Sequence, residues 1–154
     1  MSVLTQASQL GFTDVKTIKY SDFAETVSGT AETISLFTVP KDSIVERVGY
    51  YLVTNFDGAS SSDLTVAIGD SVDPNGYVAE TIIHEDATEV SSAVNSGAYF
   101  NDGTTANTVN GKVWDGASDT TMTAVFDPTG DSLTDFTAGE IRVFAKIIDL
   151  SKDI

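Results

Sequence analysis

The feature that most constrains the fold of this chain is a series of three apolar segments in the first half of the sequence. The segments 34–39, 44–54 and 64–69 are rich in β-branched and aromatic residues, and clusters of Pro, Asp, Ser and Gly separate them. Pro40 lacks a backbone N–H and ends the first segment, and residues 41–43 supply the turn into the second. This pattern is typical of consecutive antiparallel strands.

The last of these segments alternates strictly between large apolar and smaller side chains. Leu64, Val66 and Ile68 occupy one set of alternate positions, and Thr65 and Ala67 occupy the other. Because successive side chains of a strand point to opposite faces, the pattern predicts one buried face and one wet face.

Further strand patterns follow the same logic along the rest of the chain. Segments 12–20, 113–114, 120–127 and 139–150 are expected to be strands, whereas 77–84 is compatible with either a short helix or a strand. Turn residues recur about every ten positions, which is typical of a β-sandwich or barrel. We therefore expect an all-β, antiparallel β-sandwich of about eight strands with little or no helix.

The final strand pattern is apolar on both faces. One face carries Ile141, Val143, Ala145 and Ile147, and the other carries Arg142, Phe144, Lys146 and Ile148. Large apolar groups on the second face predict that a neighbouring sheet or another subunit covers it. Tyr50 and Tyr51 are adjacent and point to opposite faces, so one of the two rings can extend this surface.

We expect two parts in the chain, an amino-terminal arm and one sandwich domain. Residues 1–11 lack a convincing period but include Val3, Leu4 and Leu10, which are apolar enough to bury on a neighbour. Residues 12–154 then form a single domain, long enough to bury about 70% of the surface of the unfolded chain.

The segment 91–113 is composed mainly of small and polar residues, and Tyr99 and Phe100 are its anchors. Long segments without a strong period inside compact domains are often binding loops. The candidate interface predicted from the sequence therefore comprises Val3, Leu4, Leu10, Tyr50, Tyr51, Tyr99, Phe100, Phe144 and Ile148.

Charge and composition exclude several classes of partner. The chain has 23 acidic and 8 basic residues, a net charge of -15, so its surface repels phosphate backbones and we expect no nucleic-acid partner. No run approaches the roughly 18 apolar residues of a membrane span, and the first residues lack the basic start of a signal peptide, so we expect a soluble, unprocessed chain with no membrane partner. The absence of cysteine excludes disulfides, thiolate catalysis and the usual zinc sites.

No set of residues supplies an obvious reaction, so we expect no enzymatic activity, no catalytic residue and no cofactor. His84 is the single histidine and is expected at the surface. The turn from Asp70 to Gly76 has oxygen ligands suited to calcium, but, with Ser71 counted as the first position, the twelfth falls on Ile82 rather than on a bidentate Glu. Paired carboxylates could make a glycosidase, but Trp114 stands apart from the tyrosines, and the aromatic residues fall mostly in strand patterns.

Part of the sequence resembles small virion proteins of tailed bacteriophages. The resemblance rests on Phe37-Thr38-Val39-Pro40, Phe56-Asp57-Gly58 and Ile68-Gly69-Asp70-Ser71-Val72-Asp73-Pro74-Asn75-Gly76, and it covers residues 34–77 and the late strand 139–150. It carries over no catalytic position. It implies a β-sandwich, often a jelly roll, that decorates or cements a capsid, or else a component of a tail or fibre.

The resemblance leads to one favoured function and two alternatives. The favoured function is a capsid decoration (cement) protein, made in the host cytoplasm and located on the virion, which binds the major capsid protein as a homotrimer. The first alternative is a tail, fibre or receptor-binding module whose 91–113 loops touch a glycan. The second is a carbohydrate-binding or carbohydrate-active protein.

Overall fold

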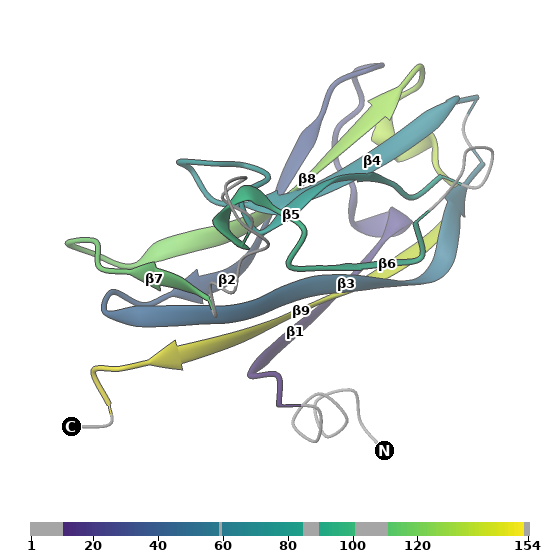
Figure 1. Cartoon of the computed structure of the whole chain (residues 1–154). Helices are drawn as coiled ribbons and strands as arrows, with labels where there is room; N and C mark the ends of the chain where they lie inside the picture. Colours follow the sequence, from purple (N-terminus) through teal and green to yellow (C-terminus); the bar gives the residue numbers. More distant parts are fainter. Residues whose placement is uncertain (1–10, 59, 85–89, 101–110, 153–154) are drawn as a thin grey trace.

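The computed structural model describes residues 11–58, 60–84, 90–100 and 111–152. These residues form two antiparallel sheets packed face to face as a sandwich (Figure 1). Regular helix is limited to the short 3-10 turns η1 (Tyr20–Asp22), η2 (Ala98–Phe100) and η3 (Leu133–Asp135) in the part of the chain that is described. The predicted all-β sandwich is confirmed.

Sheet A has five strands and sheet B has four. Sheet A contains β1 (Asp14–Lys19), β9 (Ala138–Asp149), β3 (Ser43–Asp57) and β6 (Ser92–Val94) in that order, with β7 (Lys112–Trp114) also paired to β3. Sheet B contains β2 (Glu32–Val39), β8 (Thr120–Thr129), β4 (Asp63–Gly69) and β5 (Val78–Ile82) in that order. With β7 set aside, these two strand orders are those of a jelly roll.

The core lies between the two sheets. Its largest fully buried side chains include Tyr50, Phe56, Tyr77, Phe126 and Met122. Phe56 is central, because its ring lies 5.7 Å from that of Phe23 and 6.2 Å from that of Phe126. A side chain on Gly139 would bring a Cβ within 2.2 Å of the Phe56 ring, so glycine is required where β9 crosses it.

Two strands differ from the prediction in their extent. The strand predicted at 44–54 continues to Asp57 as β3, because Phe56 must reach the core and is 0% exposed. The segment 77–84, left open between helix and strand, contains strand β5, whose residues pair with β4. The local preferences of this segment for helix and strand were balanced, and pairing with β4 favoured the strand.

The prediction for segment 91–113 is wrong in part, since β6, η2 and the start of β7 lie within it. Its short strands form because each pairs with β3. Residues 101–110 lie outside the described residues.

The alternation predicted in segment 64–69 is confirmed for the buried face. On the face that was expected to be wet, the prediction is wrong for Ala67. Leu64, Val66 and Ile68 are fully buried, but Ala67 is only 8% exposed although it was expected to be wet. β4 is an interior strand of sheet B, and Val125 of β8 lies opposite Ala67. Larger side chains on neighbouring strands shield this small methyl group from water.

The prediction that His84 lies at the surface is also wrong. His84 is 0% exposed, its ring centroid lies 5.7 Å from that of Phe136, and it forms an isolated parallel bridge with Phe56. The polar neighbours of His84 in the sequence suggested exposure, but the chain runs along the buried end of β3 at this point.

Candidate interaction surface

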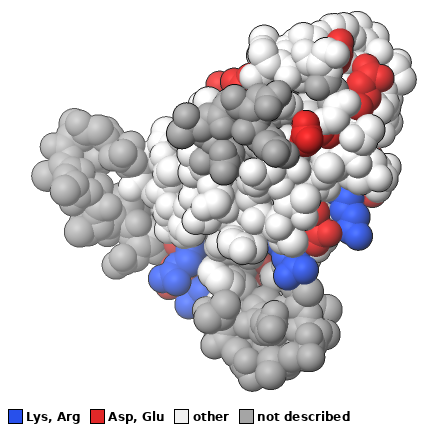
Figure 2. All heavy atoms as spheres, turned by 90° about the vertical axis from the view of Figure 1, so that its right-hand side faces the viewer, with Lys and Arg blue, Asp and Glu red and all other residues white. Residues whose placement is uncertain are grey.

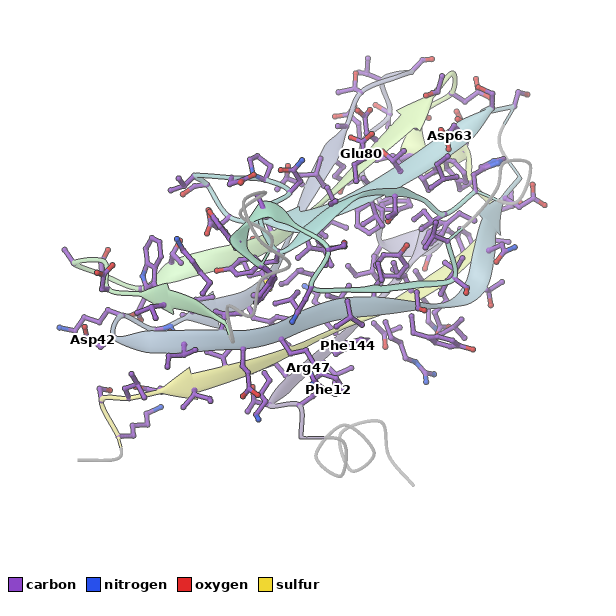
Figure 3. All side chains as sticks on the ribbon, viewed as in Figure 1. Phe12, Asp42, Arg47, Asp63, Glu80 and Phe144 are labelled. Carbon is purple, nitrogen blue, oxygen red and sulfur yellow. The ribbon has the colours of Figure 1, made fainter. Side chains whose placement is uncertain are left out.

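An aromatic pair marks the outer face of sheet A. Phe144 of β9 lies between Val15 of β1 and Gly49 of β3 in the strand register. The ring of Phe12 packs on Phe144 with 4.4 Å between centroids, and Figure 3 shows the two side chains together on the outer side of the sheet. A Cβ on Gly49 would meet the Phe144 ring at 2.8 Å, so the ring packs against this glycine. The Phe144 side chain is half-buried.

Neighbouring residues extend this surface along β9 and β3. Tyr51 lies opposite Arg142 and is 54% exposed, and Ile148 lies opposite Ile44, with both residues half-buried. We call the surface formed by Phe12, Val15, Ile44, Tyr51, Phe144 and Ile148 the β9 patch. Apolar side chains were predicted on both faces of the last strand, and the burial of Ile141, Val143 and Ala145 on the face opposite this patch confirms the prediction.

The structure separates the two adjacent tyrosines. Tyr50 is 0% exposed, and its hydroxyl donates to the carbonyl oxygen of Val90 at 2.8 Å and lies 2.8 Å from Oγ1 of Thr81. Burial raises the pKa of Tyr50, opposed in part by the hydrogen bond with Thr81. Tyr50 is therefore a core residue, and of the two rings only that of Tyr51 lies on the surface.

The other predicted interface residues lie elsewhere. Phe100 is 6% exposed and belongs to the core, so the prediction of an interface role for it is not supported by its position. Tyr99 is half-buried and contacts the β4–β5 turn. Val3, Leu4 and Leu10 lie outside the described residues.

Tyr99 braces that turn through a buried carboxylate. Oδ1 of Asp70 accepts the N–H groups of Val72 (2.9 Å) and Asp73 (3.1 Å) and the Tyr99 hydroxyl (2.9 Å). Burial raises the pKa of Tyr99, and the hydrogen bond to Asp70 raises it further. Nζ of Lys112 lies 4.5 Å from the centre of the Tyr99 ring, a cation–π contact. Tyr99 thus connects three chain segments.

Charge is distributed unequally between the two sheets. The strands of sheet A carry six basic residues (Lys16, Lys19, Arg47, Lys112, Arg142, Lys146) against five acidic ones. The strands of sheet B carry four acidic residues (Glu32, Asp63, Glu80, Asp127) and no basic one. Figure 2 shows the Lys and Arg side chains gathered toward sheet A, with acidic groups over sheet B.

Ion pairs compensate much of the charge around the β9 patch. Nζ of Lys146 lies 2.7 Å from Oε2 of Glu46. Glu140 pairs with two cations: Nη2 of Arg142 lies 3.5 Å from its Oε1, and Nζ of Lys19 lies 3.8 Å from its Oε2. The outer face of sheet A is therefore close to neutral in a chain whose net charge is -15.

The described residues contain no grouping of three or more His, Asp or Glu side chains suited to holding a metal ion. Oδ1 of Asp70, which belongs to the turn considered for calcium, already accepts three hydrogen bonds. None of the 3-10 turns in the described ranges has the length and apolar character of a membrane-spanning helix.

Comparison with known proteins shows a likeness in fold. No protein-family model and no curated protein matches this sequence. Among solved structures, a chain of the cyanophage Pam1 capsid asymmetric unit superimposes with a TM-score of 0.53 at 15% identity, over 86% of this chain and 79% of that chain. At this level of identity the likeness shows a shared sandwich fold.

Proposed function

We propose that this chain is a structural component of a phage capsid, and specifically a decoration (cement) protein that binds the outside of the shell of major capsid protein. The observation that carries the proposal is the likeness in fold, over most of both chains, to a chain of a cyanophage capsid asymmetric unit. The resemblance of residues 34–77 to small virion proteins supports the same function.

The requirements of such a protein are mechanical rather than chemical. A cement protein needs a stiff body and surfaces that bind its neighbours, but no nucleophile or oriented base. The sandwich supplies the body, with its core between the two sheets. The β9 patch supplies an aromatic surface that is not needed to fill that core.

We further propose that the working unit is a homotrimer. Three copies can turn their β9 patches toward a common axis, which hides the exposed ring of Tyr51 on every copy. The near-neutral charge of this face favours the arrangement, because chains of net charge -15 repel one another elsewhere. A trimer also suits the local three-fold positions of a capsid.

The experiment that tests the proposal is localisation in purified virions. Antibody-gold labelling or cryo-electron microscopy is expected to place the chain on the outer surface of full heads, in copies related by three-fold symmetry. Density on tails or fibres instead would favour the receptor-binding alternative and overturn the decoration role. Density inside the shell, or absence from the virion, would overturn it equally.

A further inference from the structure

A groove of about 520 Å³, lined mainly by residues with hydroxyl groups, lies on the outer face of sheet B. Its floor is formed by side chains of β2 and β8, which the antiparallel register places next to one another: Thr33 opposite Val125, and Ser35 opposite Thr123. The β4–β5 turn contributes Asp70, Ser71 and Pro74, and the approach to β8 contributes Asp119, Thr120 and Thr121. The volume falls in the range of small-ligand sites.

The position of one wall depends on a glycine. A Cβ on Gly69 would come within 2.0 Å of the carbonyl oxygen of Asp73 and 2.3 Å of the carbonyl carbon of Pro74. The β4–β5 turn therefore folds back directly over the end of β4, where its Asp70 is held by Tyr99. Backbone packing and this hydrogen bond therefore fix the wall that the turn forms.

The lining accepts hydrogen bonds and carries negative charge. Among the described residues that line it, six carry hydroxyls, two carry carboxylates and none is basic (Thr33, Ser35, Asp70, Ser71, Pro74, Asp119, Thr120, Thr121, Thr123, Val125). Lys41 approaches Asp119 only with its backbone N–H, at 3.0 Å from Oδ1, while its Nζ pairs with Asp42 at 3.9 Å. Nζ of Lys16 donates to the carbonyl oxygen of Ser35 at 2.6 Å, so one cation of the protein lies beside the lining. The two carboxylates still favour a ligand that is positively charged.

Asp70 provides a second reason to expect a cationic ligand. The residue is 2% exposed, and three hydrogen bonds converge on its Oδ1, whereas its buried Oδ2 has no hydrogen-bond partner among the described residues. A buried acceptor without a donor is costly, and a positive charge in the adjoining groove would stabilise the carboxylate.

No aromatic residue in the described part of the chain lines the groove, so these residues offer a sugar ring no platform on which to stack. The two carboxylates disfavour phosphate. An ammonium or guanidinium group fits, since it donates to hydroxyl and carboxylate oxygens alike, while the side chain of Val125 can contact its aliphatic stem. We propose that the groove binds a lysine or arginine side chain of the protein to which this chain attaches. The identity of that protein as a capsid shell rests on the proposed function.

The first test uses the purified protein with acetyl-arginine amide and acetyl-lysine amide as probes, followed by NMR of the backbone amides. We expect saturable shifts at Thr121, Thr123 and Val125, and about fivefold weaker binding in Asp119→Asn, which removes one exposed carboxylate. Asp127→Asn removes an equal charge from an exposed position of β8 outside the groove and should change the affinity less than twofold.

Each outcome of this titration bears on the inference. Equal losses in Asp119→Asn and Asp127→Asn would mean a non-specific response to net charge and would overturn it. Shifts with methyl glucoside or inorganic phosphate, but not with the two cationic probes, would also overturn it. Because Asp70→Asn keeps an acceptor at Oδ1, that variant should stay folded and lose affinity as well, and unchanged binding there would contradict the role given to Asp70.

A second experiment distinguishes failure of this inference from failure of the proposed function. Wild-type protein and the two asparagine variants are added to capsids that lack the protein, and occupancy is measured by sedimentation. Binding of the wild type that Asp119→Asn does not weaken would overturn the groove and leave the decoration role standing. Failure of the wild type to bind capsids, with the titration positive, would overturn the decoration role and leave the groove standing.

Discussion

The outer faces of the two sheets differ in both chemistry and charge. Sheet A presents aromatic and aliphatic side chains with paired charges, including the Lys146–Glu46 contact of 2.7 Å. Sheet B presents hydroxyl and acidic side chains, and its strands have no basic residue. The labelled residues of Figure 3 show the contrast, with Phe12 and Phe144 on one side and Asp63 and Glu80 on the other.

This difference indicates which face suits contacts between copies of the chain and which suits a basic partner. Two copies of a chain with a net charge of -15 repel over the Debye length of about 10 Å at 0.1 M salt, so they meet most easily where their charge is locally compensated. The β9 patch satisfies that condition. The outer face of sheet B does not, and it suits a basic partner instead.

The largest effect is expected from placing a charge in the β9 patch. Tyr51→Asp puts a carboxylate at a residue that is 54% exposed, so the monomer should stay folded. Arg142, which lies opposite, already pairs with Glu140, so the proposed trimer should weaken by about a hundredfold or more, the scale of a buried charge without a partner of its own. Sedimentation at micromolar concentration measures the change. Val72→Asp, at a residue that is 75% exposed and distant in sequence from the patch, is the matched control.

Phe144→Asp tests whether the ring of Phe144 serves self-association or the fold of the single chain, because Phe144 also packs on Phe12 within the chain. We expect a folded monomer by circular dichroism and sedimentation. A wild-type protein that is already monomeric, together with a Phe144→Asp variant that unfolds, would mean that the ring is part of the intramolecular core, and the trimer should then be abandoned.

The next effect concerns the predicted arm. Deletion of residues 1–11 is expected to leave the sandwich folded, because the described core is formed by residues from Ile18 onward, and to weaken attachment to capsids by about tenfold through loss of the apolar contacts of Val3, Leu4 and Leu10. Occupancy on particles, measured against protein concentration, checks this. Unchanged occupancy would show that these residues do not contribute to attachment.

A smaller effect, on the free energy of unfolding, is expected from loss of the hydrogen bond between Tyr99 and Asp70. Tyr99→Phe removes the hydroxyl that donates to Asp70 at 2.9 Å and should lower the free energy of unfolding by about 1–2 kcal/mol, as measured by urea denaturation. Tyr20→Phe, at an exposed tyrosine, is the control and should change it by less than about 0.5 kcal/mol. Equal effects would show that the bond to Asp70 does not stabilise the turn.

The smallest effect is expected at the ion pair beside the β9 patch. The side chains of Lys146 and Glu46 are 35% and 32% exposed, so a double-mutant cycle with Lys146→Gln and Glu46→Gln should give a coupling of about 0.5 kcal/mol that decreases with added salt. Self-association should respond more strongly, because either single variant leaves one charge uncompensated on the face. A coupling that is insensitive to salt would contradict the exposed character of the pair.

Local patterning determined much of the fold. Strict alternation predicted the buried face of β4, the break at Pro40 separated β2 from β3, and the apolar residues on both faces of β9 predicted a surface beyond the core. Each of these predictions depends on neighbouring residues along one strand, where the side-chain period of two is sufficient. The resemblance to virion proteins likewise follows turns and strands that are local in sequence.

Which of two faces is inside, and which distant segments meet, depended on the tertiary structure. Alternation placed Tyr50 and Tyr51 on opposite faces, but the packing of sheet B over sheet A, with Thr81 of β5 at the Tyr50 hydroxyl, was needed to bury Tyr50. The burial of His84 and the pairing of β6 and β7 with β3 likewise depend on chain segments far apart in the sequence. The gathering of basic residues on sheet A and the hydroxyl-lined groove on sheet B follow from strand order, which long-range hydrogen bonding sets and no local pattern encodes.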